Sequence, residues 1–159
     1  MQQCFFVKRG KPVHCESHSS PTFPSGIMSL LKCGDLLRNG QMLRSGNGRF
    51  TLCMQKDGNL VVYSGSTPIW ASRTDSKGCQ PFRLVMQEDS NLCIYDGTGR
   101  CTWASNTWRA GHAGAWVTMQ DDGNMVLYDG NGKSRALWCT RTDGGQRAPE
   151  HYHGKGHKM

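Results

Sequence analysis

The feature of this 159-residue chain that most constrains its fold is a ten-residue motif that occurs three times. The copies read MQKDGNLVVY, MQEDSNLCIY and MQDDGNMVLY, and they start at Met54, Met86 and Met119. A second motif, WASRT, WASNT or WCTRT, follows each copy and starts at Trp70, Trp103 and Trp138. Because both motifs recur together, the sequence predicts one supersecondary unit that is built three times.

Within each unit, hydrophobic and polar residues alternate with the period of a β-strand. Leu60 and Val62 fall on one face of a predicted strand, and Val61 and Tyr63 fall on the other. Turn sequences such as Asp-Gly-Asn separate the alternating runs, so each unit reads as roughly four short antiparallel strands. A further strand is expected from segments such as residues 35–43, in which Asn-Gly is a possible turn.

The composition agrees with an all-β fold. Glycine accounts for 20 of the 159 residues, which disfavours a helical bundle. Each unit carries one tryptophan at an equivalent position, and large rings of this kind pack well edge to face. We therefore expect the three tryptophans to meet near a pseudo-threefold axis.

The two ends of the chain differ from the repeats in composition. Residues 1–27 are rich in Ser, His and Pro, and residues 143–159 are rich in Gly, His and Lys. We expect both to be disordered tails around one domain, residues 28–142. The histidines within residues 151–157 could bind a metal adventitiously, but a solvated tail is the favoured interpretation.

Several classes of function are disfavoured by the composition. The net charge of +7 is spread along the chain instead of forming a basic stripe, so no nucleic-acid partner is expected. No run of 18 apolar residues occurs, so no membrane insertion is expected. The first residues contain no apolar run of signal-peptide length, which leaves the cytoplasm as an alternative location.

The cysteines and histidines do not have the spacing of a metal site. The eight cysteines form no C-x-x-C pair, and five of the six histidines lie in the predicted tails. This pattern argues against a zinc site and against a Cys–His catalytic pair, so no metal, catalytic residue or cofactor is expected. Disulfides and reduced thiols both stay open, because spacing does not reveal connectivity.

The polar face of the repeated motif has the chemistry of a sugar-binding surface. Its amides, carboxylate and phenol can exchange hydrogen bonds with neighbouring hydroxyls, and its apolar residue can contact a C–H face. One carboxylate at the core of each motif does not provide the two opposed carboxyls of glycoside hydrolysis, nor does the motif match an EF-hand loop. A single copy could serve only to satisfy the backbone of a turn, but three copies favour binding.

The predicted binding residues form one set in each repeat. The three sets are Gln55, Asp57, Asn59, Val61 and Tyr63; Gln87, Asp89, Asn91, Cys93 and Tyr95; and Gln120, Asp122, Asn124, Val126 and Tyr128.

These motifs, Q-x-D-x-N-x-V-x-Y and W-A-S/T-x-T, resemble those of the bulb-type mannose-binding lectins of monocots. The segments CGDLLRNG, from Cys33, and SGNG, from Ser45, are most similar to the lily-type lectins of fish skin mucus. The resemblance covers residues 28–142. It implies a β-prism II fold, with three four-stranded antiparallel sheets around a pseudo-threefold axis, and mannose binding without calcium.

The resemblance also implies a role for each motif residue. In the first set, Gln55 would bind the 3-hydroxyl of mannose, Asp57 and Asn59 the axial 2-hydroxyl and Tyr63 the 4-hydroxyl, while Val61 would pack on the ring. The other two sets would act in the same way. A multivalent, extracellular lectin that agglutinates its targets in surface or mucus defence would follow, with mannose-containing glycans as partners. The family often forms homodimers by exchanging C-terminal strands, here residues 136–142.

Three departures from the family pattern are visible. Cys93 stands where valine is expected in the second set, and Gly58 stands where plant members carry a cysteine, so that disulfide is absent. The leader of residues 1–27 is foreign to the family. A protein-binding module with vestigial sugar sites is therefore the alternative to a lectin, and an enzyme is the least favoured function.

Overall fold

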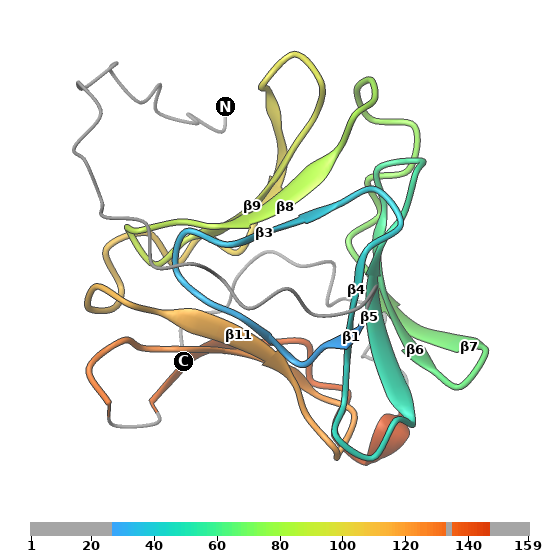
Figure 1. Cartoon of the computed structure of the whole chain (residues 1–159), viewed down its shortest axis with the longest axis vertical. Coiled ribbons are helices and arrows are strands. Elements are labelled where there is room, and N and C mark those ends of the chain that lie inside the picture. Colours follow the sequence, from blue (N-terminus) through green and yellow to red (C-terminus); the bar gives the residue numbers. More distant parts are fainter. Residues whose placement is uncertain (1–26, 133–134, 147–159) are drawn as a thin grey trace.

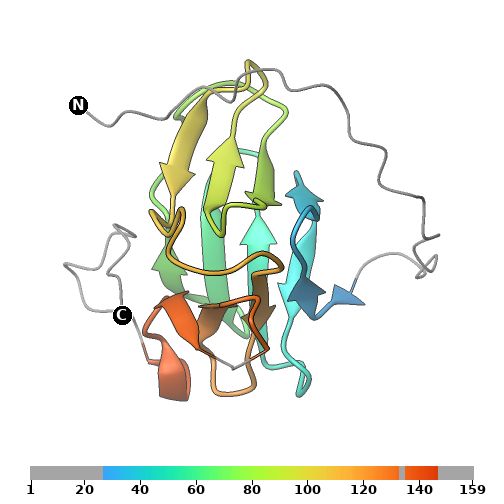
Figure 2. The same ribbon diagram turned by 90° about the vertical axis from the view of Figure 1, so that its left-hand side faces the viewer.

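The computed structural model describes residues 27–132 and 135–146, which form three sheets arranged as the sides of a triangular prism (Figure 1). Ile27 already lies in a strand, and Asp143–Gly145 form a 3-10 turn, η1, which follows the last strand at one end of the prism (Figure 2). The rest of the two predicted tails, including residues 151–157, lies outside the described residues. No helix among the described residues has the length and apolar character needed to cross a membrane.

Each repeat contributes three consecutive strands to one sheet, because its alternating runs are separated by tight turns. The bounds are β5 (Phe50–Met54), β6 (Leu60–Ser64) and β7 (Thr67–Ala71); β8 (Arg83–Met86), β9 (Leu92–Tyr95) and β10 (Cys101–Ala104); and β11 (Trp116–Met119), β12 (Met125–Tyr128) and β13 (Ala136–Cys139). The register is the same in all three repeats, since each motif methionine pairs with the residue that follows the motif asparagine.

The fourth strand of every sheet comes from residues 27–44, which we call the linking segment. Its strands β2 (Leu30–Leu31), β3 (Leu36–Arg38) and β4 (Met42–Arg44) pair with β11, β8 and β5, respectively. In addition, β1 (Ile27–Met28) pairs in parallel with β4, so the first sheet has five strands. Figure 1 shows the linking segment passing all three sheets.

The expectation of one strand over residues 35–43 is wrong, because this stretch forms two strands in different sheets. The chain turns at Gly40, whose φ of +78° is readily adopted by glycine. Leu37 and Leu43, on either side of the turn, are both fully buried, but each completes the inner face of a different sheet. The alternation of hydrophobic residues indicates a strand without identifying its partner.

The centre of the core is formed by the three repeated tryptophans, as predicted. The ring centroids of Trp70, Trp103 and Trp138 lie 5.6 to 5.9 Å apart, and the ring planes make angles of 74 to 76°. This edge-to-face arrangement is the favoured geometry for aromatic rings. The prediction of an all-β prism with three sheets is thus confirmed, with β1 as an addition to the first sheet.

Candidate functional site

The predicted binding residues of each repeat come together on the outer face of one sheet. In the first repeat, Leu60 and Val62 are buried in the core, so Val61 and Tyr63, which alternate with them, lie on the opposite face. Gln55 follows β5, and the turn to β6 carries the motif's aspartate and asparagine. The other two repeats have the same register, so the prism carries three equivalent candidate sites.

The glutamine and the tyrosine of each site are joined by a hydrogen bond. The glutamine Nε2 donates to the tyrosine hydroxyl oxygen at 2.6 Å in Gln55–Tyr63, at 2.7 Å in Gln87–Tyr95 and at 2.7 Å in Gln120–Tyr128. The tyrosine O–H can still donate to a ligand, and the glutamine Oε1 is an acceptor. This pair therefore offers one donor and one acceptor side by side.

The aspartate of each site orders the turn in which it lies. Its Oδ1 accepts a hydrogen bond from the backbone N–H of the motif asparagine. The distances are 2.9 Å for Asp57, 3.0 Å for Asp89 and 2.8 Å for Asp122. This Asx turn occupies one carboxylate oxygen and leaves Oδ2 as an acceptor on an exposed side chain.

The second motif holds the asparagine in place, a role that the sequence analysis missed. The Oδ1 of Asn59 accepts hydrogen bonds from the Ser72 hydroxyl at 3.0 Å and from the Thr74 N–H at 3.3 Å. The Thr74 hydroxyl in turn donates to the carbonyl of Gly58 at 2.7 Å. Because Oδ1 is occupied, Nδ2 is the atom through which Asn59 can donate to a ligand.

The same buried hydroxyl pair recurs in the other two repeats. Its members there are Ser105 and Thr107, which hold Asn91, and Thr140 and Thr142, which hold Asn124. All of these hydroxyl side chains are buried, so they position the asparagines and do not form the binding surface. The threefold recurrence of Ser/Thr-x-Thr after each tryptophan marks them as part of the repeated unit, but it does not reveal that they hold the asparagines.

The apolar residue of each set lies beneath the polar groups, as the floor of the site. Val61, Cys93 and Val126 are only 3%, 2% and 4% exposed, respectively. A ligand that rests on this floor can touch a small part of each side chain, so most of the contact must come from the polar groups.

The second site differs from the other two through its thiol. The Cys93 Sγ donates to the Gln87 Oε1 at 3.1 Å, which occupies an acceptor that the other sites leave for a ligand. A hydrogen bond with Cys101, together with burial, raises the pKa of the Cys93 thiol above its ordinary range. Burial also raises the pKa of Tyr95, with a further contribution from these two thiols. Both groups are therefore protonated at neutral pH.

The first and third sites thus present a compact set of two donors and two acceptors on an open sheet, and the second site presents the same set with its glutamine acceptor occupied by the thiol. The donors are the tyrosine O–H and the asparagine Nδ2, and the acceptors are the aspartate Oδ2 and the glutamine Oε1. Adjacent hydroxyls, each able to donate and accept, are the natural complement of such a set. Among the residues that the structure describes, no three or more His, Cys, Asp or Glu side chains are grouped to hold a metal ion.

No family model matches the chain, but it has clear relatives. It is 44% identical over 46 residues to a mannose-specific lectin of Narcissus pseudonarcissus, a match that spans 29% of this chain and 40% of the relative. The chain therefore matches less than half of the length of that curated relative.

Solved structures match over a larger part of the chain. The crystal structures of monomeric monocot mannose-binding lectins from Gastrodia elata include a chain that is 37% identical, with a TM-score of 0.65 over 73% of this chain and 99% of that one. The snowdrop (Galanthus nivalis) mannose-specific agglutinin, solved with methyl-α-D-mannoside, is 34% identical, with a TM-score of 0.59 over 68% and 99%. The β-prism II fold is confirmed by these neighbours. So is the prediction that the chain is not an enzyme, because the neighbours are lectins.

Proposed function

The chain belongs to the family of the monocot mannose-binding lectins, and from this premise we propose that it binds terminal mannose through the three sites on its outer faces. The observation that carries the proposal is the repetition of one polar set. In every repeat the same donors and acceptors are held by equivalent hydrogen bonds, within about 0.2 Å of one another in length. If these residues served folding alone, the atoms that face a ligand would not need to be the same in all three turns.

The arrangement of Asp57 and Asn59 supports a preference for mannose over glucose. One acceptor and one donor lie two residues apart in the same turn, and together they suit a hydroxyl that donates to the carboxylate and accepts from the amide. In the family this hydroxyl is the axial 2-hydroxyl of mannose, which is equatorial in glucose. We expect glucose to bind more weakly, because it cannot reach both groups.

We also propose that binding needs no calcium, because the motif groups are oriented by hydrogen bonds within the protein. The test is titration calorimetry of methyl-α-mannoside with and without a chelator. A dissociation constant near millimolar, about −4 kcal/mol, is expected for one sugar in an open site, and the chelator should not change it. Loss of binding in chelator would contradict the ion-free mechanism, and equal binding of methyl-α-glucoside would contradict the role of Asp57 and Asn59.

The matched control is a triple variant, Asp57→Asn, Asp89→Asn and Asp122→Asn. Asparagine keeps the Oδ1 acceptor that orders each turn, but it replaces the Oδ2 acceptor with a donor. The variant should keep its melting temperature and lose mannoside binding. Unchanged binding would show that the mannoside binds outside these three sites. Absence of mannoside binding by the unmodified chain would favour the alternative of a protein-binding module with vestigial sugar sites.

Three sites on three outer faces support a multivalent role. Linked sites can gain roughly 10²–10⁴ in avidity without any new contact, so weak single sites can still cross-link glycans. We propose agglutination in surface or mucus defence, outside the cell, as the use of this avidity. Aggregation of mannan-coated beads tests the cross-linking. Immunolocalisation in the producing tissue tests whether the protein lies outside the cell. A protein confined to the cytoplasm would contradict the proposed role.

Dimerisation by strand exchange stays a prediction from the resemblance. Here β13 pairs with β12 of the same chain, with Val126 opposite Cys139. An exchanged dimer would make the same pairing between two chains. Sedimentation velocity over a range of concentrations distinguishes the two forms: the exchange predicts a dimer that persists on dilution, and a monomer at all concentrations would exclude it.

A further inference from the structure

The three sites differ most at one position, the residue that faces the motif tyrosine from the neighbouring strand. This residue is Thr51 opposite Tyr63, Arg83 opposite Tyr95 and Trp116 opposite Tyr128. Residues directly opposite in an antiparallel pair lie close together on the same face. The first site is thus flanked by a small polar residue, the second by a cation and the third by a ring stacked on Tyr128 at 4.7 Å.

At the second site, the guanidinium of Arg83 is held beside the tyrosine. Its Cζ lies 5.4 Å from the centroid of the Tyr95 ring, within the range of a cation–π contact. Its Nη1 donates to the backbone carbonyl of Asp96 at 3.4 Å. These two contacts place a positive charge next to the tyrosine ring and use few of the guanidinium's five N–H donors.

A second arginine lies next to Arg83 on the same face. Arg38 of β3 is its direct partner in the sheet register, and the Arg38 side chain is exposed. Like charges directly opposite each other destabilise a sheet. The ion pairs among the described residues join Arg100 to Asp96, and His112 and Arg135 to Asp129, so none of them neutralises Arg38 or Arg83.

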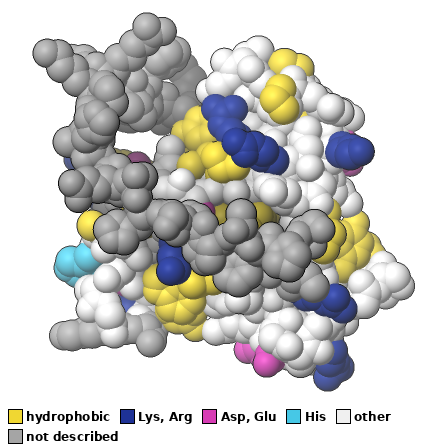
Figure 3. Space-filling model, viewed as in Figure 1, with side chains coloured by type: hydrophobic (Ala, Val, Ile, Leu, Met, Phe, Trp, Pro, Cys, Tyr) yellow, Lys and Arg dark blue, Asp and Glu magenta, His cyan; other side chains and the backbone are white. Residues whose placement is uncertain are grey.

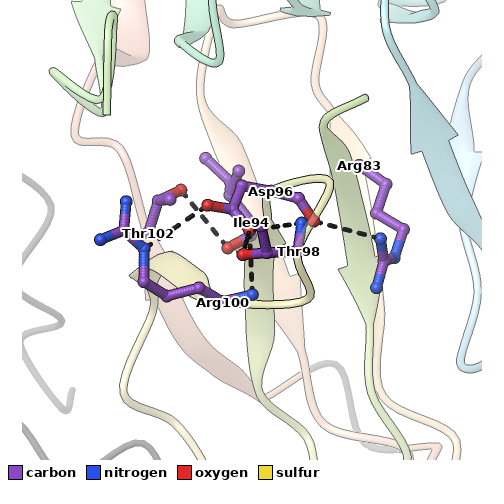
Figure 4. A network of polar contacts seen from close by, with 6 residues as sticks. All are labelled: Arg83, Ile94, Asp96, Thr98, Arg100 and Thr102. Carbon is purple, nitrogen blue, oxygen red and sulfur yellow. Dashed lines mark hydrogen bonds and ion pairs between the residues drawn. The ribbon is translucent and has the colours of Figure 1, made fainter. Parts of the chain in front are cut away.

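More positive charge lies on the other side of Tyr95. Cys101 of β10 pairs with Tyr95 and lines a pocket of about 340 Å³. The pocket is lined by Ser76, Lys77, Gly78, Arg100, Cys101 and Thr102. Figure 4 shows Arg83 and Arg100 reaching Asp96 from opposite sides, and Figure 3 shows Lys and Arg side chains beside hydrophobic surface over β8 and β9.

Among the described residues, Asp96 is the carboxylate that forms an ion pair at the tyrosine end of the site. Asp96 is buried, and its Oδ2 lies 3.4 Å from the Nε of Arg100. Its Oδ1 is occupied by the Thr98 hydroxyl and by the backbone N–H groups of Thr98 and Arg100. The two arginines on the other side, Arg38 and Arg83, therefore keep an uncompensated charge.

We propose that the second site selects a mannoside that carries an anionic group, a phosphate or sulfate ester, and that Arg83 and Arg38 contact this group. The proposal rests on the proposed function, since the sugar ring would occupy the Gln87–Tyr95 set. Guanidinium groups bind such oxyanions through paired, charge-assisted hydrogen bonds. An anion between the two arginines would also relieve their repulsion.

The test isolates the second site in the full chain with Asp57→Asn and Asp122→Asn. Titrations compare methyl-α-mannoside, mannose 6-phosphate, α-mannose 1-phosphate, mannose 6-sulfate and inorganic phosphate. At low salt, at least one anionic mannoside should bind about tenfold tighter than methyl-α-mannoside, and the gain should shrink at high salt, which screens exposed charges. The phosphate and sulfate arms identify the ester that is preferred.

Two substitutions assign the effect to the residue opposite the tyrosine. Arg83→Thr, which copies the first site, should reduce the preference for the anionic mannoside to less than about twofold. Conversely, Thr51→Arg, in a chain whose second and third sites carry Asp89→Asn and Asp122→Asn, should give the first site an anion preference. Arg49→Thr is the matched charge control, because Arg49 stacks on Phe50 in the first sheet. This substitution should not change the preference of the second site for the anionic mannoside.

The outcomes separate this proposal from the proposed function. Equal binding of neutral and anionic mannosides, or an unchanged preference in Arg83→Thr, would overturn the anionic selection and leave the lectin function intact. Inorganic phosphate binding as tightly as the mannose phosphates would also overturn it, because the site would then be a general anion site. Failure of the unmodified chain to bind any mannoside would instead overturn the proposed function. The gain expected from Thr51→Arg keeps the test decisive if Arg83→Thr folds poorly.

Discussion

At the scale of single residues, Cys93 makes the floor of the second site different from that of the other two sites. Cys93 replaces the branched side chain of Val61 and Val126 with a smaller one, and its thiol bonds to the Gln87 Oε1. The second site therefore loses both part of its floor and one acceptor. For a neutral mannoside it should be the weakest of the three sites.

The substitution Cys93→Val tests this ranking. It should free the Gln87 Oε1 and strengthen the binding of methyl-α-mannoside at the second site by under about 1 kcal/mol, or up to fivefold. The reciprocal change, Val126→Cys, should weaken the third site by a similar factor. NMR titration of the side-chain amides of Gln87 and Gln120 measures each site separately. If Asp89→Asn removes more binding of neutral mannoside than Asp57→Asn, the ranking is wrong.

Two buried carboxylates link the stability of the fold to pH. Asp96 and Asp129, directly after two of the motif tyrosines, are 2% and 1% exposed. The hydrogen bond from the Thr98 hydroxyl lowers the pKa of Asp96 below its ordinary value of 3.8. The backbone N–H of His112, which donates to Oδ1 at 2.6 Å, does the same for the pKa of Asp129.

The sign of the pH effect follows from these lowered pKa values. Near and below pH 4 the unfolded chain binds more protons at these groups than the native chain does. The stabilisation they provide is therefore complete above the ordinary pKa and is lost as the pH falls through the native values. Urea unfolding between pH 7 and pH 2.5 should show this loss, with a smaller pH dependence in Asp129→Asn and no such reduction in the exposed control Glu88→Gln. An equal pH dependence in Asp129→Asn would contradict the assignment.

The chemistry of the sites could be predicted from the sequence, but their support could not. Gln55, Asp57 and Tyr63 are recognisable because polar residues at strand and turn positions recur in three copies. Ser72 and Thr74 recur equally often, yet they lie 13 and 15 residues beyond Asn59 in the chain. Only the folded register brings them to the asparagine, and hydrogen bonds between distant positions leave no local pattern.

At the scale of elements, the turn between the first two strands of the first and third repeats is under tight steric control. Gly58 has a φ of +91°, and a Cβ at this position would lie 2.7 Å from the ring of Phe82. Gly123 is similarly close to the ring of Phe50, also at 2.7 Å. In this chain the ring of Phe82 occupies the space that a cysteine at position 58 would need.

The substitution Gly58→Ala, compared with Gly99→Ala, measures this steric control. Both glycines have positive φ, but no atom lies within 4 Å of a Cβ at Gly99. Each alanine should cost about 1 kcal/mol for its backbone conformation, and Gly58→Ala should cost a further 1–3 kcal/mol for the clash with Phe82. Denaturant unfolding gives both values. Equal costs would show that Phe82 moves aside freely.

The pairing of the linking segment shows where the prediction of elements reached its limit. Leu37 and Leu43 each have the alternating neighbours of a strand, and Gly40 is recognisable as a turn residue. A strand–turn–strand pattern normally favours a hairpin. Here the strands are only three residues long, and each gains more by closing the inner face of a different sheet than by pairing with the other.

At the scale of the whole molecule, the three sheets share one core and one linking segment. The tryptophan of each sheet contacts the other two, and every sheet receives at least one strand from residues 27–44. In solenoid repeats a unit contacts only its neighbours, so local unfolding is possible. In this prism, unfolding of one sheet would expose the tryptophan rings of the other two sheets.

Three matched substitutions test this cooperativity. Leu31→Ala, Leu37→Ala and Leu43→Ala each remove a fully buried side chain from the linking strand of a different sheet. Each should cost about 2–5 kcal/mol. Each should also lower the midpoint of a single unfolding transition, and tryptophan fluorescence and far-UV circular dichroism should report the same midpoint. Met42→Ala, at an exposed position of β4, is the control and should cost under about 0.5 kcal/mol. Two separated transitions in any leucine variant would contradict a single folding unit.

The linking segment also sets the order in which a growing polypeptide can finish its fold. Leu30 and Leu31 leave the ribosome before any repeat, but their partners, Thr118 and Val117, belong to the third repeat. Domains generally fold as units during synthesis, and an unpaired apolar strand exposed meanwhile is prone to aggregation. The nascent chain must therefore carry two unpaired leucines through the translation of two complete repeats. This early part of the domain is among the last to be buried, and a chaperone that binds short apolar segments would have its target there.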